Sequence, residues 1–154
     1  MKATLQVGLV GLGWVASQYI KSFTLNPHCT IRAACVRNLE KGKQAIRNLG
    51  IASCELFTDI DEMLTKTDLD IVCILTPNNL HTSQAIKCAQ AGKHLIIEKP
   101  AALNWEEAVI LREKLLESGV QNISGYVLRW NSLFKNIREI LARDMLGKIF
   151  HIEI

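Results

Sequence analysis

The sequence has 154 residues, 49% of them apolar, so it can bury one complete hydrophobic core but is too short for two full domains. Its 18 basic and 15 acidic residues give a net charge of +3 and are interspersed, which argues against a nucleic-acid-binding protein. No apolar run approaches the roughly 20 residues of a membrane helix, and the first residues lack a signal-peptide pattern, so we expect a soluble, cytoplasmic protein without a membrane partner.

The cysteines do not form a disulfide or metal-binding pattern. They are odd in number, far apart in the sequence, and contain no Cys-x-x-Cys pair; they are Cys29, Cys35, Cys54, Cys73 and Cys88. Most lie in apolar stretches, where a thiol packs as a small hydrophobic group. The sequence therefore predicts free thiols in a reducing compartment and no metal site.

The first half of the chain alternates between strand and helix patterns. Short apolar runs typical of buried parallel strands occupy 5–10, 31–36 and 54–57, and helices are expected at 14–23 and 39–49. Thr58, with Asp61 three residues later, resembles a capping box that opens a short helix to Thr65. This order is the βαβαβ half of a doubly wound sheet.

The alternation continues in the second half. Strands are expected at 70–75, 94–98 and 121–126, and helices at 79–91 and 104–118, the last opened by Asn104 with Glu107. Strands that alternate with helices imply an α/β fold with a doubly wound parallel sheet, of the Rossmann type. We expect this domain to span residues 1–124.

The pattern changes after residue 124. An amphipathic helix at 131–143 is followed by Gly147 and by an apolar strand pattern at 148–154. An apolar strand needs a sheet to join, so residues 125–154 are expected to begin a second α/β domain, broken off by the end of the sequence. Association through the edge of this C-terminal sheet would give a homo-oligomer.

A glycine-rich turn follows the first strand and opens the first helix. The pattern Gly11-x-Gly13-x-x-Ala16 stands where a dinucleotide-binding turn is expected. Gly11 permits the tight turn, Gly13 lets the backbone approach a pyrophosphate, and Ala16 lets helix and strand pack closely. Trp14 and Val15 open the helix, whose free N–H groups attract phosphate. Trp14 either packs over the dinucleotide or simply covers the helix face.

The end of the second strand bears on the choice between NAD and NADP. An acidic residue usually stands there to bind the ribose hydroxyls of NAD, but this strand ends with Val36 and Arg37. A guanidinium can pair with a 2′-phosphate, so NADP is slightly favoured over NAD. The alternative is that Arg37 is a solvated surface cation.

Three further motifs resemble a known family. They are Thr76-Pro77-Asn78-Asn79-Leu80-His81 after the fourth strand, Ala91-Gly92-Lys93-His94, and Glu98-Lys99-Pro100 after the fifth strand. With the glycine turn they resemble the Gfo/Idh/MocA family of glucose-fructose oxidoreductase and inositol dehydrogenase. The resemblance implies a Rossmann domain that binds NAD(P) and a C-terminal α/β domain that holds the substrate and forms oligomer contacts. It also implies hydride transfer to or from a secondary alcohol or ketone of a sugar, cyclitol or related polyol.

The resemblance also implies residue roles. Thr76, Pro77 and Asn78 would line the cofactor, and His81 would begin the helix beside them, in a cofactor-binding or structural role. Glu98 would lie near the nicotinamide ribose. Lys99 would lie near the nicotinamide and act on the substrate hydroxyl, with Pro100 after a cis peptide bond. A partly desolvated lysine near a cationic ring suits proton transfer.

The second-domain part of the resemblance is incomplete. Arg129, in Arg129-Trp130-Asn131, would contact cofactor or substrate, or only tie the two domains together. Family members carry an Asp and a His on one helix of the second domain, and no histidine follows Asp144 at helical spacing. Because this pair is missing, a dinucleotide-binding regulatory module without catalysis stays open as an alternative. The resemblance leaves a further alternative, an NAD-dependent glycosidase of the same fold family.

Overall fold

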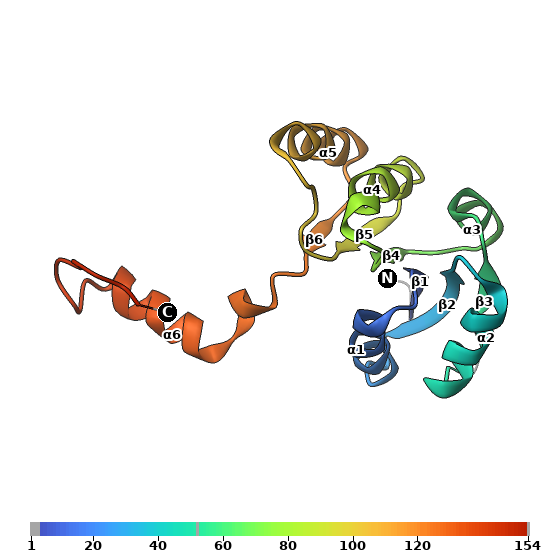
Figure 1. The fold of residues 1–154 in the computed structure, drawn as a ribbon, viewed down its shortest axis with the longest axis horizontal. Helices are drawn as coiled ribbons and strands as arrows, with labels where there is room; N and C mark the ends of the chain where they lie inside the picture. The colour runs from blue at the N-terminus through green and yellow to red at the C-terminus, as the bar shows by residue number, and fades with distance from the viewer. Residues whose placement is uncertain (1–3, 52, 154) are drawn as a thin grey trace.

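The core of the molecule is a six-stranded, wholly parallel sheet with strand order β3-β2-β1-β4-β5-β6 (Figure 1). The computed structural model describes residues 4–51 and 53–153. The strands are β1 (Leu5–Val10), β2 (Cys29–Cys35), β3 (Glu55–Phe57), β4 (Ile71–Ile74), β5 (His94–Ile97) and β6 (Asn122–Ser124). This is the strand order of a doubly wound dinucleotide-binding fold, so the predicted fold class is confirmed.

Helices cover both faces of the sheet. Helices α1 (Trp14–Thr24) and α2 (Leu39–Asn48) lie on one face, and α3 (Ile60–Lys66), α4 (His81–Gln90) and α5 (Trp105–Ser118) lie on the other (Figure 1). Each face has its own buried cluster: Leu9, Ala16 and Ile20 belong to the α1 side, and Met63, Val72 and Ile97 to the other side. The central strands β1 and β4 are buried on both faces because helices pack on both, which explains their near-continuous apolar sequences.

The sheet reverses its winding direction at β1. This strand pairs with β2 on one side and with β4 on the other. After β1 the chain adds strands towards one edge of the sheet, and after β4 it adds strands towards the opposite edge. In open parallel sheets such a reversal leaves a crevice at the carboxyl ends of the two strands. The glycine turn and the Thr76 motif both begin at this crevice.

Helix α5 begins as the sequence predicts. Asn104 accepts a hydrogen bond from the Glu107 backbone N–H at 2.8 Å, and the Asn104 side-chain amide donates to the Glu107 carboxylate at 3.1 Å. Glu107 also accepts from the Leu103 N–H, and this bond is the main reason that its pKa lies below the usual value. The predicted capping pair is confirmed.

The predicted cap of α3 is wrong by one residue. The helix is capped by Asp59, whose Oδ1 accepts from the Glu62 backbone N–H at 2.8 Å, whereas the prediction placed Thr58 and Asp61 in these positions. Both pairs have the required spacing. The choice is made by the core, because the Asp59 cap turns Ile60 and Met63 inward, where both are buried.

The chain leaves the body of the molecule after β6. A short 3₁₀ turn, η2 (Val127–Trp130), leads into α6 (Ser132–Ala142), and the segment projects as an arm (Figure 1). The apolar stripe of α6 stays exposed, as with Leu133 and Ile137. The strand predicted at 148–154 is wrong over 148–153, where no strand forms; Ile154 lies outside the described residues. Among the described residues, 148–153 have no neighbouring strand with which to pair. The homo-oligomer contact expected through the C-terminal sheet stays a prediction.

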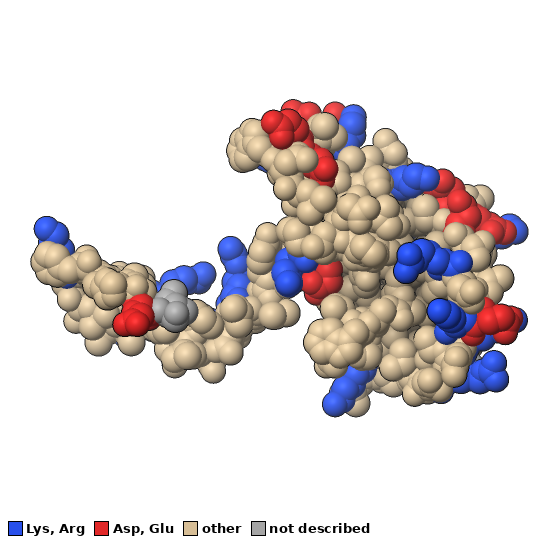
Figure 2. All heavy atoms as spheres, viewed as in Figure 1, with Lys and Arg blue, Asp and Glu red and all other residues tan. Residues whose placement is uncertain are grey.

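The structure also shows how the charged side chains and the cysteines are distributed. Figure 2 shows acidic and basic side chains interspersed over the face in view. All five cysteines are free thiols. Among residues 4–51 and 53–153 there is no helix with the length and apolar character needed to cross a membrane, and no group of three His, Cys, Asp or Glu side chains that could hold a metal ion.

Candidate functional site

A cavity of about 820 Å³ opens at the carboxyl ends of β1, β2 and β4. Its walls come from the glycine turn, the loop between β2 and α2, the start of α3 and the Thr76 motif. Seven of the residues predicted to bind the cofactor line it: Gly11, Gly13, Trp14, Val15, Arg37, Thr76 and Pro77. The sheet thus brings together segments that are far apart in the sequence.

Glycine is needed at the two positions of the turn for different structural reasons. Gly11 has a φ of +95°, and a Cβ atom there would lie 2.9 Å from the backbone oxygen of Leu75. A side chain at Gly13 would instead meet nothing within 4 Å, because the Gly13 Cα faces open space. Gly11 is therefore required by the turn itself, whereas Gly13 keeps a space that a side chain would occupy.

The first turn of α1 is free to bind an anion. Gly13 is its N-cap, and no side chain caps the helix or places a negative charge in its first turn. Ala16 is fully buried, which lets α1 pack closely on the sheet. Exposed N–H groups and the partial positive charge of the helix end fit a pyrophosphate. Trp14 is 82% exposed beside this turn, so its indole is available to a ligand and does not belong to the core.

Two cations line the cavity where the loop between β2 and α2 forms its wall. Arg37 is exposed just after β2, and Lys41 lies in the first turn of α2, where its backbone N–H is bound by the N-cap Asn38 at 3.0 Å. Asp59 also lines the cavity, but its carboxylate caps α3. This end of the cavity is therefore suited to bind an anionic or polyhydroxyl group.

The Thr76 motif supplies the wall beside β4. Thr76 donates from its hydroxyl to Gln84 at 2.6 Å, and Pro77 and Asn78 are exposed at the start of the short η1 turn (Asn78–Leu80). His81 begins α4 as predicted, but its side chain is only 1% exposed and does not line the cavity. Its ring nitrogens lie 2.7 Å from the Thr76 oxygen and 2.8 Å from the Pro100 oxygen. His81 therefore lies behind the cavity wall and ties two loops together.

The Glu98 motif follows β5 at the same edge of the sheet. Glu98 is half-buried and accepts a hydrogen bond from the Tyr19 hydroxyl at 2.8 Å, while its other oxygen accepts from the Lys99 backbone N–H at 2.9 Å. Lys99 is exposed, and the peptide bond before Pro100 is cis, as the resemblance implied. Burial, the Glu98 hydrogen bond and the Glu98 charge together raise the pKa of Tyr19 above its usual value.

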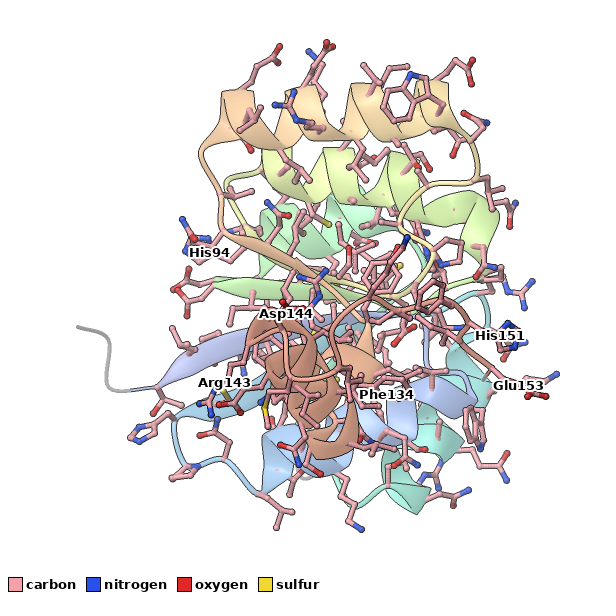
Figure 3. All side chains as sticks on the ribbon, turned by 90° about the vertical axis from the view of Figure 1, so that its left-hand side faces the viewer. His94, Phe134, Arg143, Asp144, His151 and Glu153 are labelled. Atoms are coloured by element: carbon pink, nitrogen blue, oxygen red, sulfur yellow. The ribbon has the colours of Figure 1, made fainter. Side chains whose placement is uncertain are left out.

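The remaining predicted residue is Arg129. Arg129 is exposed in η2, on the connection to the arm, and does not line the cavity. Figure 3 faces the arm and shows the side chains of Asp144 and His151 well separated from each other. Among the described residues, the arm therefore supplies no Asp and His pair on one helix.

Several residues of the site were not predicted. Lys41, Asp59 and Gln84 line the cavity, and Tyr19 binds Glu98 across the sheet. Lys41 and Asp59 carry a signal in the sequence, because both stand at helix starts that follow strands, and such starts meet at one edge of a parallel sheet. Tyr19 carries no such signal, since its partner is 79 residues away.

Comparisons with known proteins agree with this geometry. Residues 5–126 match the Gfo/Idh/MocA family, described as an oxidoreductase family with an NAD-binding Rossmann fold. The scyllo-inositol 2-dehydrogenase (NAD(+)) of Bacillus subtilis is 29% identical over 150 residues, 96% of this chain and 43% of its own length. The 2,7-anhydro-N-acetylneuraminate hydratase of Escherichia coli is 28% identical over 145 residues, 94% of this chain and 38% of its own length.

Solved structures give the same result. The scyllo-inositol dehydrogenase of Lactobacillus casei, with bound NAD(H) and scyllo-inositol, has a TM-score of 0.86 at 26% identity and covers 95% of this chain. The WlbA dehydrogenase of Bordetella pertussis, in complex with NADH and UDP-GlcNAcA, has a TM-score of 0.90 at 26% identity and covers 97%. Both matches span 43% of those chains, so this chain corresponds to less than half of each. The chain belongs to the Gfo/Idh/MocA oxidoreductase family and carries its NAD-binding Rossmann fold.

Proposed function

We propose that the chain is the NAD(P)-binding part of a cytoplasmic oxidoreductase that transfers hydride between nicotinamide and a secondary alcohol or ketone of a sugar, cyclitol or related polyol. The observation that carries this proposal is the cavity formed by the glycine turn and the Thr76 motif at the reversal point of the sheet. Relatives named as inositol dehydrogenases support the substrate class.

We propose the same division of the chain that its sequence suggests. Residues 1–124 would form the cofactor domain, and residues 125–154 would begin a domain for substrate binding and oligomer contacts. Arg129 lies on the connection between the two parts, which suits a contact with the substrate, the cofactor or the second domain. The relatives match this chain over about two fifths of their length, which supports a further domain in the functional protein.

The residues of the cavity fit a dinucleotide. The uncapped start of α1 would bind the pyrophosphate, Gly13 would leave room for it, and the wall at Thr76 and Pro77 would bind the nicotinamide half. When bound, the nicotinamide supplies hydride transfer. Asn78, Glu98 and Lys99 lie on the loops that follow β4 and β5 at the same sheet edge, where Glu98 would bind the nicotinamide ribose.

Lys99 is the proposed acid–base group. In alcohol oxidation its neutral amine takes the hydroxyl proton as the carbon loses hydride, and in ketone reduction the ammonium returns that proton. The lysine stands at the carboxyl end of β5, next to β4, with its backbone N–H bound to Glu98. A panel of inositols, aldoses and nucleotide sugars, followed by nicotinamide absorbance, tests the activity of the full-length oxidoreductase.

Replacement of Lys99 tests its role. Lys99→Ala is expected to lower turnover by about 10² or more, because the proton transfer loses its catalyst. The matched control is Lys114→Ala, which removes a partly exposed lysine paired with Glu117 on α5. Unchanged turnover in Lys99→Ala would exclude this role. Absence of both binding and turnover in the unmodified protein would contradict the proposed function itself.

We also propose that the cofactor is NADPH in preference to NADH. Arg37 and Lys41 would bind the 2′-phosphate, and each charge-assisted contact is worth enough to change affinity by about tenfold. Calorimetry should therefore show weaker NADPH binding in Arg37→Ala and Lys41→Ala and nearly unchanged NADH binding. Lys43→Ala is the control, because this lysine pairs with Glu40 on the same helix outside the cavity. Tighter binding of NADH in the unmodified chain would contradict the preference.

A redox-neutral reaction at the same site is the second candidate. Two relatives are named as hydratases, and the lack of a net redox change would distinguish such a reaction from that of a dehydrogenase. Product formation without a net change in nicotinamide absorbance would favour this candidate. NAD-dependent glycoside cleavage would give the same absorbance result but would release a free sugar. Tight cofactor binding without any turnover would favour a regulatory module.

A further inference from the structure

A chain of hydrogen bonds connects the pyrophosphate-facing helix to the proposed acid–base loop. Tyr19 lies on α1, and its hydroxyl donates to Glu98 Oε1 at 2.8 Å. The second carboxylate oxygen, Oε2, accepts from the Lys99 backbone N–H at 2.9 Å. Strand β4 lies between β1 and β5 in the sheet, so the Tyr19 side chain bridges the reversal point at which the two halves of the fold meet.

Both oxygens of the Glu98 carboxylate are thereby held. A carboxylate bound at only one oxygen is free to turn about its last bonds, whereas one bound at both has a fixed plane. Its donors come from different segments: one from α1 and one from the loop that carries Lys99. The position of this loop relative to α1 is therefore set through Glu98.

Gly125 lies against the same pair of side chains. Its backbone N–H donates to the Ile97 oxygen at 2.8 Å. Gly125 therefore continues the pairing of β6 with β5. A Cβ atom at Gly125 would lie 2.8 Å from Glu98 Oε1 and 3.0 Å from the Tyr19 hydroxyl oxygen. The atom that must move first is the end of a flexible side chain, so an alanine there would displace the carboxylate and leave the backbone in place.

We propose that Tyr19 is a positioning residue for Lys99, which acts by holding the Glu98 carboxylate in a space that Gly125 leaves free. This inference rests on the proposed role of Lys99. The raised pKa of Tyr19 agrees with it, because the hydroxyl stays protonated as the donor to Glu98 over the physiological pH range.

Amide hydrogen exchange at Lys99 tests the inference. In the ¹⁵N-labelled chain, Tyr19→Phe removes the donor to Glu98 Oε1 and Gly125→Ala crowds that oxygen. Each variant is expected to speed exchange of the Lys99 amide by about tenfold. Tyr126→Phe is the matched control, since it removes the hydroxyl of the other tyrosine, which is exposed. It should leave the Lys99 amide unchanged.

The outcomes separate this inference from the proposed function. Unchanged exchange at Lys99 in both variants, with both still folded, overturns the positioning role. If Tyr19→Phe does not fold, Gly125→Ala decides the question alone, because its strain falls on a side-chain end. NADH and NADPH binding to the unmodified chain is measured separately; failure to bind either would contradict the proposed function, while the exchange result would still decide whether Tyr19 controls Lys99.

Discussion

Individual residues in the glycine turn serve either the fold or the ligand. Gly11 adopts a left-handed conformation against the Leu75 backbone, while Gly13 adopts an ordinary extended one beside open space. The sequence pattern treats the two glycines alike, because it records only that both are small. Their different surroundings give different expected results for substitution.

Substitution at the two glycines should separate stability from binding. Gly11→Ala is expected to lower the free energy of unfolding by about 1–3 kcal/mol, because it combines a positive φ with a contact to backbone. Gly13→Val should leave the urea midpoint nearly unchanged and abolish NADH and NADPH binding, since its side chain fills the space left for the pyrophosphate. A stable, well-binding Gly11→Ala variant would contradict the first expectation.

Tyr19 gives the chain a specific alkaline response. Its pKa is higher in the folded chain than in the unfolded chain, where a tyrosine ionises near pH 10. The hydrogen bond from Tyr19 to Glu98 therefore contributes its full stabilisation of the folded state below about pH 10. This contribution is lost as the pH rises above that value. Titration of tyrosinate absorbance should show a component that ionises only well above pH 10. This component should disappear in Tyr19→Phe and persist in Tyr126→Phe. A late component that survives in Tyr19→Phe would assign it to another group.

At the scale of elements, two asparagine caps are expected to stabilise the fold to different extents, according to what their helices pack against. Asn104 caps α5, which contributes Leu111 to the buried core, and Asn131 caps α6, which contributes nothing to either buried cluster. A cap stabilises the whole fold only if the fold depends on its helix. The two asparagines therefore form a natural matched pair.

Asn104→Ala is expected to lower the free energy of unfolding by about 1 kcal/mol, because two helix-end hydrogen bonds are lost. Asn131→Ala should leave the cooperative unfolding transition unchanged and reduce helical content only in the arm. Urea denaturation followed by circular dichroism measures both. Equal losses of stability would show that α6 is part of the cooperative unit.

Some element ends were predictable and others were not. The cap of α5 follows from Asn104 and Glu107 because no neighbouring pair competes with it. At α3, two pairs one residue apart fit the same pattern, and burial of Ile60 and Met63 favours Asp59. Local sequence gives the type of cap, whereas the core decides its position.

At the scale of the whole molecule, the described chain consists of a closed core and an open arm. None of the residues in the two buried clusters lies beyond Val120, and α6 exposes Leu133 and Ile137 to solvent. The arm extends away from the sheet, as Figures 1 and 2 show. The core should therefore fold without the arm.

Removal of residues 127–154 tests this division. The shortened chain is expected to keep the urea midpoint and the NADH and NADPH affinities of the full chain, because every residue of the cavity and of the core is retained. A loss of affinity without a loss of stability would show that Arg129, which is removed, contacts the cofactor. It should also associate less, since it lacks the exposed apolar stripe of α6. Size-exclusion chromatography and calorimetry measure these properties. A large loss of stability would show that the arm packs on the core in solution.

The sequence by itself determined the order of strands and helices, the parallel sheet, and the residues of the glycine turn and of the Thr76 and Glu98 motifs. These features depend on local periodicity, on glycine, and on short motifs at fixed spacing, all of which are visible along the chain. The same local signals failed at residues 148–153, because a strand pattern becomes a strand only where another strand is available to pair with it.

The tertiary structure decided which residues meet. It buried His81 behind the cavity wall, added Lys41 to the end of the cavity that holds Arg37, and placed the Tyr19 hydroxyl on Glu98. Each of these outcomes depends on distances between segments far apart in the chain, which the packing of helices on the sheet sets and sequence spacing does not.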